Sequence, residues 1–319
     1  MKKLIKSMIF LMGFSIILSG CSKKDNKNDV NGKLKIYTTI FPLEDFTKKI
    51  GGNMVEAESI IPPNVEAHSY EPSTKTMVDM SESNAFIYTG AGIEGFGDKA
   101  AEILKSENIP VVKATKGMKL LKGEHHHQES QSGDPYGGED EDEHGDTDPH
   151  VWLDPIRSIQ IAENIKNSLV QLHPKGKAQF EKNFHALKTE LLKLDKEYAD
   201  TIKKSPKKEI LVSHAAYGYW ENRYGIHEIS VMGLSPSEEP SQKTLENIIS
   251  TSRKHNIHYV IFEKNISSKI SQIVEQELGA KPLTLNNLES VSQEAIQNKE
   301  DYFSLMRENL KNLKIALSN

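Results

Sequence analysis

Short apolar runs alternate with amphipathic segments along most of the first half of the chain. Four runs rich in β-branched and aromatic residues predict strands at 33–39, 55–61, 85–89 and 110–114. The segments between them repeat apolar residues at helical spacing, around 43–50, 73–82 and 94–107. Strands that alternate with helices in this way favour a parallel sheet covered by helices.

The second half of the chain repeats the alternation. Strands are predicted at 209–213, 258–262 and 281–285, with a weaker one at 227–232, and helices near 241–255, 267–278 and 299–316. Between the halves, Asp154 and Pro155 are a good N-cap and first residue for a helix.

A second central helix is predicted over about 175–204, where apolar residues step by three or four along one face. A helix of ~30 residues reaches roughly 45 Å. We therefore predict an α/β fold with two lobes, each a parallel sheet covered by helices, joined by one long linking helix. The predicted boundaries are 34–173 for the N-terminal lobe, 174–205 for the linking helix and 206–319 for the C-terminal lobe.

The first residues predict export. A lysine-rich start precedes an apolar run over 8–18 that suits a signal-peptide core and is too short to span a bilayer comfortably. Leu18-Ser19-Gly20-Cys21 resembles the lipobox of bacterial lipoproteins, which implies cleavage after residue 20 and lipidation of Cys21. The alternative is an ordinary secretory signal. Residues 21–33 are polar and predict a flexible tether, so we expect a lipid anchor on the extracytoplasmic face of the cell membrane.

A histidine- and acid-rich segment over 123–147 interrupts the pattern. It has no apolar periodicity and predicts a loop that buries no core. Its imidazoles and carboxylates predict loose zinc capture, with a solvated acidic loop as the alternative. The loop histidines are His125, His126, His127 and His144. The net charge of −5 argues against a nucleic-acid partner.

Three other histidines and one glutamate fall where ligands bind in parallel sheets, beyond the carboxyl ends of strands. His68 and Glu289 follow predicted strands within loops, His214 follows one directly, and His150 precedes the Asp154 helix start. The wide separation of these residues fits no local metal-site spacing. On pattern alone each could be an ordinary loop residue.

Their surroundings are more specific. The segments 64–73, 148–155, 213–220 and 285–290, with a further signature over 233–241, resemble, in order, motifs of the metal-specific solute-binding proteins of bacterial ABC importers. The resemblance covers nearly the whole mature chain. It implies one metal ion in the cleft between the lobes, with His68, His150, His214 and Glu289 as ligands. Glu263 or water is the alternative to Glu289 as the fourth ligand, although for Glu263 a role in orienting the site or in packing within its lobe is preferred.

Three imidazoles and one carboxylate suit tetrahedral zinc, whereas manganese prefers a harder, carboxylate-rich site. The resemblance thus implies a non-enzymatic, monomeric protein that captures Zn²⁺ with high affinity and delivers it to an ABC permease driven by an ATPase. Because neutral imidazoles are needed, affinity is expected to fall below about pH 6.5. The alternatives are a manganese-binding relative with an adhesin role and a secreted zinc hydrolase, although no HExxH motif is present.

One further motif, the GxGxxG pattern over 90–95, has the outline of a dinucleotide fingerprint. The acidic residue expected at the end of the next strand is missing. We therefore interpret it as a tight strand-to-helix turn.

Overall fold

The structure of the protein is a computed structural model that describes residues 32–123, 147–264 and 268–318. The predicted signal peptide, Cys21 and nearly all of the tether lie outside the described residues, as do His125, His126, His127 and His144. Among the residues that are described, no helix has both the length and the apolarity needed to cross a membrane.

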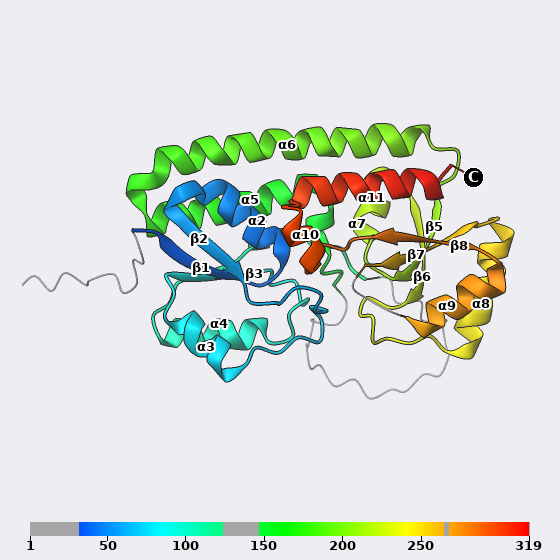
Figure 1. Cartoon of the computed structure of the whole chain (residues 1–319), viewed down its shortest axis with the longest axis horizontal. Coiled ribbons are helices and arrows are strands. Elements are labelled where there is room, and N and C mark those ends of the chain that lie inside the picture. The colour runs from blue at the N-terminus through cyan, green and yellow to red at the C-terminus, as the bar shows by residue number, and fades with distance from the viewer. Residues whose placement is uncertain (1–31, 124–146, 265–267, 319) are drawn as a thin grey trace, which may run out of the picture.

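Two four-stranded parallel sheets form the centres of two lobes (Figure 1). The strand orders β2-β1-β3-β4 and β6-β5-β7-β8 have the same topology, with the first strand of each lobe placed inside its sheet. The strands are β1 (Leu34–Thr38), β2 (Val55–Ser59), β3 (Ala85–Tyr88), β4 (Val111–Lys113), β5 (Glu209–His214), β6 (His227–Met232), β7 (Tyr259–Glu263) and β8 (Lys281–Leu285). The predicted two-lobe α/β fold is confirmed.

Ten α-helices surround the sheets in the described part of the chain. They are α2 (Phe41–Gly51), α3 (Thr74–Ser81), α4 (Gly97–Ser106), α5 (Pro155–Leu172), α6 (Lys177–Lys204), α7 (Gly218–Tyr224), α8 (Gln242–Lys254), α9 (Lys269–Leu278), α10 (Gln293–Gln297) and α11 (Tyr302–Ala316). The predicted start of α5 is correct, because the Asp154 carboxylate accepts the backbone N–H groups of Ile156 and Arg157. Helices α7 and α10 were not predicted, since seven and five residues are too few for a clear period.

Helix α6 runs along one side of the molecule and covers both lobes (Figure 1). Its 28 residues correspond to about 42 Å. Its buried apolar face packs on α2 and α5 of the N-terminal lobe and on α7 and α11 of the C-terminal lobe. At the C-terminal end, the Tyr198 hydroxyl donates to the Met306 carbonyl of α11 at 2.6 Å. Helix α6 is therefore a brace shared by the two lobes.

The lobes also share a hydrophobic core. One cluster of buried apolar residues extends from β1 through α6 to α11, whereas a smaller cluster lies within the C-terminal lobe against α8 and α9. Two buried indoles cross between the lobes: Trp152 Nε1 donates to the Asn287 carbonyl and Trp220 Nε1 to the Leu153 carbonyl, both at 2.7 Å. Main-chain bonds from Phe41 to Glu289 and from Asn64 to Val291 add to these contacts. The interlobe boundary is thus packed and hydrogen-bonded.

Candidate metal centre

Four side chains from four separate segments meet where the lobes face each other. His68 lies in the loop after β2 and His150 just before a 3₁₀ turn at Val151–Leu153. His214 is the last residue of β5, and Glu289 lies in the loop after β8. One ligand atom from each lies within 4.8 Å of the others. The structure therefore brings together all four residues that the sequence motifs singled out.

The spacing of these atoms fits a small cation with four ligands. The Nε2 atoms of His214 and His150 are 3.4 Å apart, and Glu289 Oε1 is 3.5 Å from His150 Nε2 and 3.6 Å from His68 Nε2. Bonds of about 2.0–2.1 Å to zinc would separate ligand atoms by about 3.3–3.4 Å at the corners of a tetrahedron. The buried Nε2 of His68 has no hydrogen-bond partner among the described residues. The donor set could therefore hold a tetrahedral cation if the ligand atoms, which lie within 4.8 Å of one another, move closer together.

Two carboxylates orient the imidazoles from behind. Asp148 Oδ1 is 2.9 Å from His150 Nδ1, and Glu263 Oε1 makes a short contact with His214 Nδ1. A histidine that donates its Nδ1–H to a carboxylate leaves the Nε2 lone pair free for a metal ion. His150 and His214 are fully buried, so these partners fix rings that water does not reach. Glu263, the sequence-based alternative for the fourth ligand, lies on the far side of the His214 ring, whereas Glu289 faces the centre.

The Glu289 carboxylate is held on both oxygens. Oε1 accepts a hydrogen bond from Asn287 Nδ2 at 2.8 Å, and Oε2 accepts one from the Ala67 N–H at 3.3 Å. The loop before Glu289 includes Leu288 in the left-handed region with a φ of 61°. The Leu288 N–H donates to the Asn286 side chain, which stabilises this conformation. Sequence reasoning did not identify Asn287 or Asp148 as positioning groups, although both lie within the motif segments, at 285–290 and 148–155.

The His68 loop is shaped by a neighbouring acid. The Glu66 carboxylate accepts the N–H groups of His68 and Ser69 at 2.6 and 2.9 Å. These bonds hold the loop in a turn, and the Ala67 N–H at the same turn reaches Glu289. The first histidine and the fourth ligand candidate are therefore coupled across the lobe boundary.

Charges within the cluster favour a protonated histidine beside an ionised glutamate when no cation is bound. Burial opposes charge on His150, but hydrogen bonds and charges from Asp148 and Glu289 outweigh it and raise the pKa of His150 to about 10. Burial likewise opposes charge on Glu289, but His150 and His68 hold the pKa of this carboxyl well below its usual range. A metal ion that binds here must displace the His150 proton.

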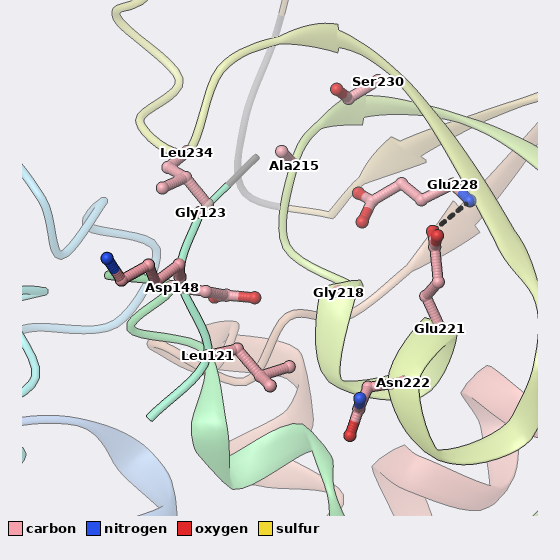
Figure 2. A pocket seen from close by; sticks show the side chains of 11 residues that line it. Leu121, Gly123, Asp148, Ala215, Gly218, Glu221, Asn222, Glu228, Ser230 and Leu234 are labelled. Atoms are coloured by element: carbon pink, nitrogen blue, oxygen red, sulfur yellow. Dashed lines mark hydrogen bonds between the residues drawn. The ribbon is translucent and has the colours of Figure 1, made fainter. Parts of the chain in front are cut away.

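A pocket of about 320 Å³ lies on the far side of Asp148 (Figure 2). Asp148 and Glu228 point into it from opposite walls, and Glu221 accepts the Glu228 N–H at 2.8 Å. Burial, followed by the charge of Asp148, raises the pKa of Glu228 to about 8. Gly218 lines the same pocket, where a Cβ atom would come within 2.7 Å of Asp148 Oδ2. The backbone of α7 therefore approaches Asp148 too closely for any side chain at this position.

The glycine-rich turn over 90–95 lies next to β3. Its Glu94 carboxylate accepts the N–H groups of Thr89 and Gly90 at 2.8 and 3.4 Å, and it is also bonded to the Thr39 hydroxyl. An internal carboxylate thus takes the backbone donors that a phosphate would need. The arrangement supports the interpretation of this motif as a strand-to-helix turn.

Comparison with known proteins identifies the family of this chain. The sequence model of the family described as zinc-uptake complex component A, periplasmic, matches residues 36–316. The zinc-binding lipoprotein AdcA of Streptococcus pneumoniae strain R6 is 36% identical over 98% of this chain, which spans 61% of the length of AdcA. The high-affinity zinc uptake system protein ZnuA of Bacillus subtilis is 33% identical over 95% of this chain and 94% of its own.

The fold has a solved counterpart. The crystal structure of the Zn(II)-bound ZnuA-like domain of S. pneumoniae AdcA is similar with a TM-score of 0.74 and 35% identity, and the match covers 90% of this chain and 100% of that domain. Because the family model and the B. subtilis relative both match nearly the full chain, this protein belongs to the ZnuA family of zinc-uptake components.

Proposed function

We propose that this protein captures one Zn²⁺ ion with high affinity at His68, His150, His214 and Glu289 and delivers it to an ABC permease in the membrane. The observation that carries the proposal is the convergence of four ligand atoms within 4.8 Å of one another, with three of the separations at 3.4–3.6 Å. The name of the B. subtilis relative, a high-affinity zinc uptake system protein, supports the same assignment.

The donor set favours zinc over manganese. Three neutral imidazoles and one carboxylate oxygen make a nitrogen-rich site, and zinc lies above manganese in the affinity order for such sites. With four protein ligands the coordination shell is closed, and an open position for a substrate or a reactive water is absent. The ion is therefore cargo, and we propose no catalytic activity.

The partners follow from this role. The zinc-loaded protein would dock on a permease whose transport is driven by an ATPase. Cys21, which lies outside the described residues, would carry the lipid anchor, as the name "lipoprotein" of the AdcA relatives supports. The protein would act as a monomer at the extracytoplasmic face of the cell membrane. Size-exclusion chromatography with light scattering tests the monomer directly, and metabolic labelling of the chain with radioactive palmitate, lost in Cys21→Ser, tests the anchor.

The ligand assignment is tested by chelator competition on soluble protein that starts at Ser22. We expect one tight zinc, and a loss of about 100-fold or more in affinity for each of His68→Ala, His150→Ala and His214→Ala, because each leaves three ligands. Glu289→Ala removes the one carboxylate oxygen and should cost as much. His185→Ala, an exposed histidine on α6, is the matched control. Unchanged affinity in His214→Ala would contradict the assignment.

The histidine-rich loop is a separate part of the proposal. We expect deletion of residues 124–147 to leave the tight zinc in place and to slow loading when zinc is scarce, because clustered imidazoles raise the local zinc concentration. Loading that is equally fast with and without these residues would count against capture. Loss of the tight zinc on deletion would instead place the main site in the loop and refute the cleft assignment.

A further inference from the structure

We infer that Asn287 is a metal-specificity residue, which positions Glu289 as a one-oxygen ligand and so favours four-coordinate zinc over manganese. The inference rests on the proposed function, because it concerns the same cluster. It starts from the side-chain amide of Asn287, which is 5% exposed and lies between two buried carboxylates.

The amide joins the two candidate ligands of the C-terminal lobe. Asn287 Nδ2 donates to Glu289 Oε1 and to Glu263 Oε2, both at 2.8 Å. The other Glu263 oxygen contacts His214 Nδ1. An NH₂ group has two hydrogens, so these two bonds use its full donor capacity. His214 and Glu289 are thereby fixed relative to each other through Glu263 and one amide.

The chemistry of the position calls for an uncharged double donor. Glu263 contacts the His214 imidazole with one oxygen, and Glu289 presents one oxygen to the proposed cation site. Two carboxylates this close repel unless donors lie between them. A lysine or arginine could supply donors, but its positive charge would also repel the incoming metal ion. An asparagine separates the carboxylates without adding a charge.

The position of Asn287 also sets how Glu289 presents its oxygens. Oε1 accepts from Asn287 and is the oxygen nearest to His68 and His150. Oε2 is turned away, toward the Ala67 N–H. A carboxylate held in this rotation offers one oxygen to the centre and cannot easily swing to chelate with both. One-oxygen binding keeps the coordination number at four, which zinc accepts and which manganese, with its preference for six, does not.

Asn287 is itself anchored at its backbone. Its carbonyl accepts the buried Trp152 indole N–H at 2.7 Å, and its Oδ1 accepts the Glu289 N–H at 3.2 Å. The Asn287 backbone is therefore held from the opposite lobe, and its side-chain amide is held from its own loop. A residue that only filled space would not need four directed hydrogen bonds.

The test compares wild type with Asn287→Ala and the isosteric Asn287→Asp, using zinc and manganese as separate probes in chelator competition. Asn312→Ala is the matched control, because Asn312 is a half-buried asparagine whose amide bonds the Thr284 carbonyl of β8 rather than a cluster residue. We expect zinc affinity to fall about 10- to 100-fold in both Asn287 variants, the usual cost of losing a partner of a metal ligand. Manganese affinity should fall less, or rise in Asn287→Asp, so that the ratio of zinc affinity to manganese affinity drops.

Cobalt(II) substitution gives a readout that a purely structural role would not change. Wild type and Asn312→Ala should show the intense visible absorption of a tetrahedral cobalt site, and the Asn287 variants the weaker bands of a higher coordination number. Equal losses for both metals with an unchanged cobalt spectrum would overturn the inference, as would an unchanged zinc affinity. If wild type itself binds no tight zinc, or if His214→Ala binds as well as wild type, the proposed function fails instead. Circular dichroism melting curves confirm that each variant is folded, and Asn287→Asp serves if Asn287→Ala is not.

Discussion

Zinc binding should release a proton from His150 throughout the neutral and mildly alkaline range. In the cluster without a cation, His150 Nδ1 faces Asp148 at 2.9 Å and Nε2 faces Glu289 at 3.5 Å, so both N–H groups of an imidazolium have an acidic partner. These acids outweigh the effect of burial and raise the pKa of His150 to about 10. Zinc needs the Nε2 lone pair and therefore competes with this proton.

The size of the effect follows from the distance between pH 7 and that pKa. Three pH units below its pKa, His150 is neutral in about one molecule in 1,000, which lowers the apparent affinity by about 4 kcal/mol relative to a neutral site. Between pH 7 and pH 9 the apparent zinc affinity should therefore rise about tenfold per pH unit. A histidine with the ordinary pKa of about 6.5 would leave the apparent zinc affinity almost unchanged between pH 7 and pH 9.

The assay is chelator competition at pH 7, 8 and 9, combined with titration calorimetry in two buffers of different ionisation enthalpy. We expect about one proton released per zinc at pH 8. Asp148→Asn removes the nearer acid, lowers the pKa of His150, and should flatten the dependence above pH 8. An affinity that is constant from pH 7 to pH 9, with no proton released, would refute the assignment of a protonated His150 to the empty cluster.

Three further perturbations test other parts of the structure. Gly218→Ala would place a Cβ atom 2.7 Å from Asp148 Oδ2 and should displace this carboxylate from His150. Zinc affinity, measured by chelator competition, should fall about 10- to 100-fold. An unchanged zinc affinity would contradict the contact. The wild-type protein should lose stability as pH rises from 4.5 to about 8, because folding raises the pKa of Glu228 over this range. Glu228→Gln removes this loss, so the variant should become increasingly more stable than wild type as pH rises. Urea midpoints of both proteins at pH 5 and pH 8 measure this, and a difference in midpoint that does not grow with pH would exclude it. Tyr198→Phe removes the hydrogen bond to the Met306 carbonyl between α6 and α11. It should cost about 1–2 kcal/mol and lower Tm by about 2–3 °C for a chain of this size, and an unchanged Tm would show that this bond does not support the brace.

The alternation of apolar and amphipathic segments was sufficient to predict the two sheets, because each buried strand and each longer helix has its own local period. The four cluster residues could be named because they lie within motifs that resemble those of a known family, whereas their positions relative to the strands left each of them open as an ordinary loop residue. The roles of the residues around them could not be read in the same way. Asn287 acts on Glu263, 24 residues away, and is held by Trp152, 135 residues away. Such partners are set by the packing of the two lobes, for which the sequence carries no local signal.

Glu263 illustrates the same limit. The sequence places it after a strand at the same sheet edge as His214, which makes it an alternative ligand, although a role in orienting the site or in packing is preferred. Whether a carboxylate at that edge faces the Nε2 or the Nδ1 side of a neighbouring imidazole depends on the ring orientation, and this is decided by contacts from the other lobe. The structure shows the Nδ1 side.

The cluster is complete only when both lobes have folded. Two of its residues, His68 and His150, belong to the N-terminal lobe, and His214 and Glu289 to the C-terminal lobe. A chain in which only one lobe has folded would offer at most two of the proposed ligands, and its zinc affinity would be low. At the site proposed above, zinc would stabilise only the molecule in which both lobes have folded, in proportion to the logarithm of the free zinc concentration. Chains that are still folding would then leave scarce zinc to folded ones, and bound zinc would mark a fully folded molecule.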